Sequence, residues 1–303
     1  MNKTALFLIF LSILLAVYPG RPAKSEGEKY LVGGLSIYGG DQDATYKDFI
    51  SHFAKIIGMR ERAAFDIQWY SDRDKFLKLI KEKKFDYIFP SGYDVMVYSL
   101  GHGYEPFLAP SVGGKEKDNF CIYGKQDGKI KTLPDVRGGK TMVVGDQFYF
   151  YLIRKMVGES PLDFFGRLRE APNSNSAVYA FAMGELDVLF FDDFGITYFK
   201  AVNSGPVKGL KALACSGTIF QDPALRSSKV PEEQANRMRK YFVNAGKDKA
   251  FKDFWPLMKM INGRLIEVSK SDYKPVLDIF AEAQKNGWDK EYQKWLKMAK
   301  SAK

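Results

Sequence analysis

The chain has 303 residues, is 46% hydrophobic, and carries 46 Lys and Arg against 36 Asp and Glu, for a formal net charge of +10. This length can bury a full core, as one large domain or as two medium lobes. The basic residues are interleaved with acids and form no long block of like charge, so the composition favours solvated faces and argues against a nucleic-acid-binding arm.

The N-terminus has the pattern of a secretory signal peptide. Lys3 precedes an apolar run from Ala5 to Val17, and small residues follow at Ala23 and Ser25. The run is shorter than the roughly 20 residues that a membrane-spanning helix needs, although an uncleaved anchor stays open as an alternative. We expect residues 1–25 to be removed by cleavage after Ser25, and the mature protein to be periplasmic. This removal takes away three basic residues and no acid, which lowers the net charge to +7.

The rest of the chain alternates between strand and helix patterns, which is typical of an α/β protein with mostly parallel sheets. The expected strands cover residues 30–37, 64–69, 85–89, 120–124, 141–144, 168–171, 186–191 and 210–215. Helices are expected over residues 44–57 and 177–183. A further helix is expected after each of the turns near 71–74, 90–92 and 145–147. The C-terminal region is expected to be helical, with helices over 231–244, 251–258 and 273–286.

The constellations of common enzymes are missing from the sequence. It contains two histidines, His52 and His102, and no cluster with metal-ligand spacing. Asp192 and Asp193 could be paired carboxylates, but adjacent residues that leave a strand point in opposite directions, so at most one of them faces a given cleft. We therefore expect no catalytic activity, no metal and no cofactor.

Polar and aromatic residues gather in the loops that follow strands and precede helices. Ligands of open α/β sheets bind at the carboxyl ends of strands, and a helix start offers free N–H groups. Each residue taken singly could be an ordinary cap or turn former, but their shared position indicates a small-molecule site. The candidate ligand-binding residues are Tyr38, Ser91, Tyr93, Asp146, Gln147, Tyr149, Asn175 and Asp192.

The order of several segments resembles the periplasmic substrate-binding proteins of phosphate, phosphite and phosphonate ABC transporters, the PhnD-like family. The matching segments are FDYIFPSGYDVMVYSLGHGYEPFLAP (85–110), TLPDVRGGKTMVV (132–144), AVYAFAMGELDVLFFDD (177–193), and the tail from ACSGTIFQDP (214–223) to SDYKPVLDIF (271–280). The resemblance implies the type II periplasmic-binding-protein fold, with two α/β lobes joined by two hinge strands that close on a ligand. Lobe one would comprise residues 26–120 and 217–303, and lobe two residues 121–216.

The two cysteines, Cys121 and Cys215, could pair in an exported protein or could be separate small buried residues. The resemblance places both on the segments that cross between the lobes, which favours a disulfide.

One segment departs from the family pattern. Where phosphonate binders have a run of the Ser-Thr-Ser-Gly type, this chain has Asp146-Gln147-Phe148-Tyr149, and a carboxylate with two aromatics cannot supply those hydroxyls. We expect a phosphonate-like ligand or an altered one that bears an amine or an aromatic group. It would stack on Tyr38, Tyr93, Phe148 or Tyr149, and Asp146 or Asp192 would pair with a cationic group.

The resemblance implies a monomer that delivers its ligand to an ABC transporter permease and does not bind nucleic acid. The alternative is a sensory protein of the same fold that feeds a membrane-bound sensor kinase. An enzyme on this scaffold is a third alternative.

Overall fold

The computed structural model describes residues 29–35, 50–51, 54–59, 63–144, 146–247, 249 and 262–301. The expected signal peptide, Tyr38 and the helix expected over 251–258 lie outside these residues. Within the described ranges, no helix combines the length and the apolar character that crossing a membrane requires.

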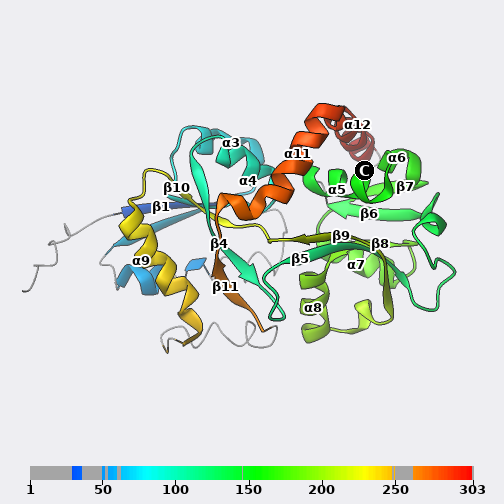
Figure 1. The fold of residues 1–303 in the computed structure, drawn as a ribbon, viewed down its shortest axis with the longest axis horizontal. Helices are drawn as coiled ribbons and strands as arrows, with labels where there is room; N and C mark the ends of the chain where they lie inside the picture. Colours follow the sequence, from blue (N-terminus) through cyan, green and yellow to red (C-terminus); the bar gives the residue numbers. More distant parts are fainter. Residues whose placement is uncertain are drawn as a thin grey trace, which may run out of the picture.

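The chain forms two α/β lobes that lie side by side (Figure 1). The first lobe has a six-stranded sheet in the order β11-β4-β10-β3-β1-β2. Its strands are β1 (Lys29–Leu35), β2 (Ala64–Tyr70), β3 (Tyr87–Phe89), β4 (Tyr104–Ser111), β10 (Ala224–Ser227) and β11 (Arg264–Glu267). Its helices include α3 (Arg73–Lys81), α4 (Tyr93–Leu100) and α9 (Glu232–Val243).

The second lobe has two smaller sheets, ordered β8-β5-β9 and β6-β7. The strands are β5 (Asp118–Lys125), β6 (Lys140–Val144), β7 (Arg167–Ala171), β8 (Leu189–Asp192) and β9 (Leu210–Ile219). The helices are α5 (Gln147–Val157), α6 (Pro161–Phe164), α7 (Ser174–Ala182) and α8 (Asp193–Val202).

The prediction of mostly parallel sheets is wrong for the described strands. Only β1 with β2, β1 with β3, and β6 with β7 pair in parallel. The remaining pairings are antiparallel and involve β4, β10 and β11 in the first lobe and β5 with β8 and β9 in the second. The chain crosses between the lobes and then returns. The strands of these crossings therefore run antiparallel to their neighbours.

Strands β5 and β9 cross between the lobes as an antiparallel pair (Figure 1). Cys121 on β5 lies opposite Cys215 on β9, and a disulfide joins them, with 4.1 Å between their Cα atoms. The two crossing strands are therefore covalently linked at their centre.

The C-terminal helices α11 (Lys274–Asn286) and α12 (Trp288–Ser301) extend from the first lobe to the second, where they pack on α5 and β7 (Figure 1). Trp295 of α12 is buried, stacks on Phe150 of α5, and donates its indole N–H to the Leu168 carbonyl at 3.1 Å. The lobe boundaries at residues 120 and 217 remain a prediction. In the structure α11 contacts α5, and α12 contacts α5 and β7 of the second lobe.

Local sequence explains the bounds of α5. Asp146 caps its N-terminus by accepting a hydrogen bond from the Phe148 N–H, and Gly158 ends it in the left-handed conformation, at φ 78°. Between them Phe148 and the segment 150–153 are buried. This helix therefore begins with a carboxylate at the lobe boundary and packs its apolar side into the core.

Candidate functional site

The two lobes meet where α4 of the first begins opposite the start of α5 of the second. Gly92 precedes α4 with φ 137°, and a Cβ there would lie 2.8 Å from Asp146 Oδ2 and 3.0 Å from Asp94 Oδ1. Only glycine allows this close approach of the backbone. Asp146 is 7% exposed, so its carboxyl group is enclosed between the lobes.

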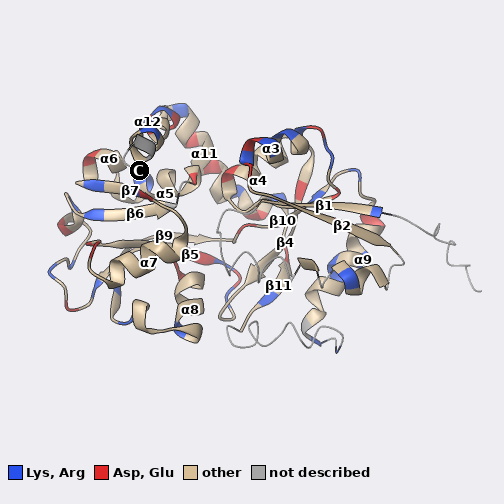
Figure 2. Cartoon of the chain, turned by 180° about the vertical axis from the view of Figure 1, so that it is seen from behind, with Lys and Arg blue, Asp and Glu red and all other residues tan. Residues whose placement is uncertain are grey.

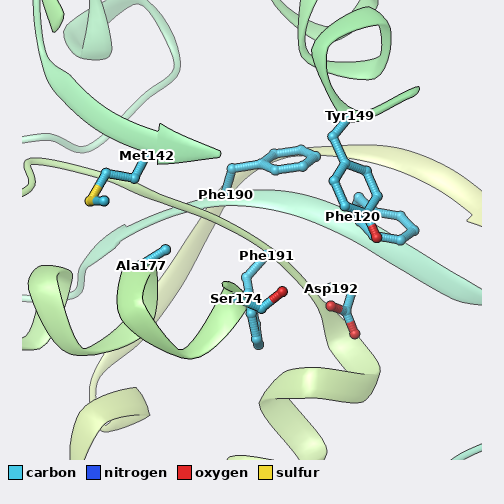
Figure 3. Close-up of a pocket in the computed structure, with 8 residues that line it drawn as sticks. All are labelled: Phe120, Met142, Tyr149, Ser174, Ala177, Phe190, Phe191 and Asp192. Atoms are coloured by element: carbon cyan, nitrogen blue, oxygen red, sulfur yellow. The ribbon is translucent and has the colours of Figure 1, made fainter. Parts of the chain in front are cut away.

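A cavity lies in the second lobe (Figure 3). The space that water can occupy in it measures about 20 Å³, room for about one water molecule. Three aromatic rings lie together on one side, and Ser174 and Asp192 lie on the other (Figure 3). The lining residues are Phe120, Met142, Tyr149, Ser174, Ala177, Phe190, Phe191 and Asp192.

Asp192 belongs to a buried pair of carboxyl groups. It caps α8 by accepting a hydrogen bond from the Gly195 N–H at 2.5 Å, and it is hydrogen-bonded to Asp118. Burial, followed by the charge of Asp192, raises the pKa of Asp118 to about 9. Asp118 therefore holds a proton at neutral pH and donates it to the Asp192 carboxylate.

Asp118 also connects both crossing segments to the second lobe. Its carboxyl group accepts hydrogen bonds from the Phe194 N–H, at 3.2 Å, and from the Gln221 side chain, which follows β9. Asp118 itself begins β5 and is fully buried. A single carboxyl group thus ties the two crossings to the start of α8.

A second group of carboxylates surrounds Gly92. Asp222 accepts a hydrogen bond from the Gly92 N–H, and burial together with the charge of Asp94 raises the Asp222 pKa to about 7. Burial, with the charges of Asp94 and Asp222, also raises the pKa of Asp146 well above its ordinary value. Arg73 pairs with Asp94 at the exposed edge of this group.

The start of each second-lobe helix that faces the cavity is capped by a side chain of the same segment. Asp146 accepts from Phe148 N–H on α5, Asn173 from Ser176 N–H on α7, and Asp192 from Gly195 N–H on α8. One N–H group at each of these helix starts therefore already has an internal acceptor, and these caps leave the other N–H groups of the first turn unused.

The structure brings together part of the predicted site. Tyr149 and Asp192 line the cavity, and Asp146 lies at the contact between the lobes. Only Asp192 of the adjacent pair lines the cavity, whereas Asp193 accepts a hydrogen bond from the Tyr123 hydroxyl at 2.6 Å.

Other predicted residues lie away from the cavity. Tyr93 is fully buried, and its hydroxyl donates to the Phe220 carbonyl at 2.6 Å, so its ring offers no face for a ligand in this structure. Gln147 points to α12 and donates to Asp289 at 2.6 Å. Ser91 forms the turn before α4 with φ 47°, and Asn175 lies in the first turn of α7 without lining the cavity. Tyr38 is outside the described residues.

Several residues at the site did not stand out in the sequence. Phe120 and Phe190 read as ordinary strand positions, and Asp118 lies two residues before the predicted start of its strand. Asp222 follows the last predicted strand, and no helix was predicted to start directly after it. The one available signal was for Ser174, because it lies in the polar loop before α7.

Comparisons with known proteins identify the family of the chain. The family model described as ABC transporter, phosphonate, periplasmic substrate-binding protein matches residues 38–273. No curated protein matches the sequence.

Solved structures of binding proteins share the fold. A binding protein component of an ABC phosphonate transporter from Pseudomonas aeruginosa is 16% identical with a TM-score of 0.66, and the match covers 91% of this chain and 95% of that one. PhnD1 from Prochlorococcus marinus, in complex with methylphosphonate, is 10% identical with a TM-score of 0.65 and coverages of 86% and 99%. The aliphatic sulphonate binding protein SsuA from Escherichia coli is 12% identical with a TM-score of 0.55 and coverages of 86% and 88%.

The fold is thus that of the type II periplasmic binding proteins, as expected. The sensor-kinase alternative has no support among these matches. Proteins of the matched family bind solutes in the periplasm and deliver them to ABC transporter permeases. Since the family model spans most of the sequence, the chain belongs to the periplasmic substrate-binding proteins of phosphonate ABC transporters.

Proposed function

We propose that the exported chain captures a small molecule in the second-lobe cavity beside the crossing strand β5 and hands it to the permease of an ABC importer. The observation that carries this proposal is the convergence of Tyr149, Ser174 and Asp192, from three helix starts, beside Phe120 of the crossing strand β5. A ligand held there contacts an element that must bend when the lobes close, so occupancy would be coupled to closure.

The protein acts by binding rather than by catalysis, as a monomer, without a cofactor and without nucleic acid. Support comes from the solute-binding family and from the surface charge, because basic and acidic residues are scattered over both lobes (Figure 2). Export is followed by cleavage near Ser25, which mass spectrometry of the exported protein would check directly.

A thermal-shift screen of the exported protein tests the binding site. The compounds are phosphonates, phosphite, phosphate, amines, amino acids and small aromatic acids, because a ligand that binds only the folded state raises the melting temperature. Each hit is repeated with Ser174→Phe, which fills the cavity, and with Met183→Phe, which adds the same ring at the other end of α7, where Met183 is 70% exposed.

We expect Ser174→Phe to abolish the shift and Met183→Phe to retain it. A ligand whose shift is the same in wild type and Ser174→Phe would contradict the site. For transport, the ligand-loaded protein should stimulate ATP hydrolysis by the permease and ATPase encoded beside its gene, reconstituted in liposomes. Equal ATPase rates with loaded and Ser174→Phe protein would contradict delivery.

A further inference from the structure

The lining of the cavity contains no cationic side chain that would bind an anion. None of its eight lining residues is a lysine or an arginine. At the nearby helix starts, Asp146, Asn173 and Asp192 of the same segments each accept one of the N–H groups that an anion could use. A phosphonate in the cavity would lie against the Asp192 carboxylate with no cationic side chain in the lining to balance it, and like charges repel.

Three aromatic rings make one wall of the cavity. The ring centroids of Phe120 and Tyr149 are 5.1 Å apart, those of Phe120 and Phe190 are 6.1 Å apart, and those of Tyr149 and Phe190 are 5.9 Å apart. Aromatic faces carry a negative potential that attracts cations, and a methylated ammonium group also gains from contact with apolar ring surface. This wall is suited to an alkylated cation.

The opposite wall supplies negative charge. The Asp192 carboxylate lies across from the rings (Figure 3). Asp222 does not line the cavity, but its Oδ1 is enclosed without a hydrogen-bond partner among the described residues, and the charge of Asp192 is one of the causes, after burial and the charge of Asp94, that raise its pKa. A positive charge bound beside Asp192 would therefore be favoured by both carboxyl groups.

The cations near these carboxylates belong to pairs outside the cavity. Arg73 pairs with Asp94, and the Lys115 ammonium lies 3.7 Å from Asp193. Neither lines the cavity. The charge that would balance Asp192 is therefore not provided by the lining residues.

We infer that the ligand is a small organic cation, an alkylated ammonium whose apolar groups contact Phe120, Tyr149 and Phe190 and whose charge is held by Asp192. This inference rests on the proposed function and names its ligand class. The cavity holds about one water molecule, so the ligand enters when the lobes or the Tyr149 side chain move apart.

Isothermal titration calorimetry tests the class with three probes. Choline carries a quaternary ammonium, 3,3-dimethylbutan-1-ol has the same shape without the charge, and methylphosphonate is an anion of similar size. We expect choline to bind at least about tenfold more tightly than the neutral alcohol, and methylphosphonate to give no heat. The comparison of choline with its neutral analogue needs no variant and is independent of folding defects.

Two neighbouring carboxylates give matched variants. Asp192→Asn retains an N-cap for α8 but loses the charge, and we expect it to weaken choline binding at least about tenfold. Asp193→Asn changes the adjacent residue, which does not line the cavity, and should leave the affinity within about threefold. Tyr149→Leu should also weaken binding, because it removes one ring of the aromatic wall.

The outcomes separate the ligand class from the proposed function. Methylphosphonate binding that is lost in Ser174→Phe would overturn the cation class and leave the cavity as the binding site. Choline binding that Ser174→Phe does not affect would overturn both. The absence of heat with choline at millimolar concentrations, or equal affinities for choline and the neutral alcohol, would also overturn the cation class.

Discussion

Cys121 and Cys215 lie directly opposite each other on the two strands that cross between the lobes, and their disulfide closes a loop of 94 residues. The loop contains most of the second lobe. Cys121 is buried, whereas Cys215 is exposed, so a reductant can reach the bond from the side of β9.

Loss of this disulfide should destabilise the protein. The double variant Cys121→Ser/Cys215→Ser frees the 94-residue loop in the unfolded state, and a loop of this length implies a cost of about 2–5 kcal/mol. For a chain of this size, the melting temperature should fall by roughly 5–15 °C. Calorimetric melts with and without dithiothreitol measure this fall in the melting temperature. The double variant is the control, since dithiothreitol should not change its melt; a wild-type melt that is unchanged after complete reduction would contradict the role of the bond.

The Tyr93 hydroxyl should contribute to stability rather than to ligand contact. Tyr93→Phe removes the donor of the Phe220 carbonyl at a buried position, which should lower the free energy of unfolding by about 1–3 kcal/mol. Denaturant titration measures the change, and Tyr179→Phe, at a 44% exposed tyrosine, should be neutral. If Tyr93→Phe is as stable as wild type but binds ligand more weakly, the ring belongs to the site after all.

The positions of the helix starts at the site could be predicted from the sequence, because caps are local. Asp146 and Asp192 are N-caps whose acceptor geometry depends on residues two or three positions ahead. The direction of the next side chains could not be predicted in the same way. Tyr93 points into the core and Gln147 points to Asp289, which is 142 residues away on a helix that the sequence patterns did not predict.

The antiparallel part of the first sheet could not be predicted from the sequence, because its strands contain proline or are short. Strand β4 contains Pro106 and Pro110 but lies between β10 and β11 in the sheet, whereas proline within a run normally argues against a central strand. Strand β10 spans only Ala224–Ser227. Likewise, Asp118 and Asp192 meet only because β5 and β8 pair, and this long-range register has no signature in the local sequence.

Asp118 should make the folded protein less stable as the pH rises. The unfolded chain releases this proton near the ordinary pKa of 3.8, but the folded protein holds it to about pH 9, so the folded state binds more protons between these values. Its contribution is fully present below about pH 4 and is lost as the pH rises toward 9, with a slope of up to about 1.4 kcal/mol per pH unit. The raised pKa values of Asp146, Asp192 and Asp222 act in the same direction.

Guanidinium unfolding from pH 5 to 9 measures this dependence. Asp118→Asn should flatten the decline, because an amide does not titrate. Asp135→Asn is the matched control: the hydrogen bond from the Thr132 side chain lowers the pKa of that exposed carboxyl, so its titration lies below this range. Identical slopes in wild type and Asp118→Asn would show that the folded state does not retain this proton.

The packing of α12 on the second lobe should be essential for the stability of that lobe. Trp295 is 1% exposed, stacks on Phe150 at a centroid distance of 5.5 Å, and satisfies the Leu168 carbonyl, so Trp295→Ala removes a large buried ring and a hydrogen bond together. We expect a loss of about 3–5 kcal/mol in the free energy of unfolding, whereas Met298→Ala, at a 54% exposed position on the same helix, should cost less than about 0.5 kcal/mol.

Hydrogen exchange of Trp295→Ala shows which part of the protein is destabilised. The amides of α5 and β7 should lose protection while those of β1 and β2 in the first lobe keep theirs, because α12 contacts α5 and β7. Protection lost equally in both lobes would mean that α12 stabilises the molecule as a single cooperative unit rather than the second lobe alone.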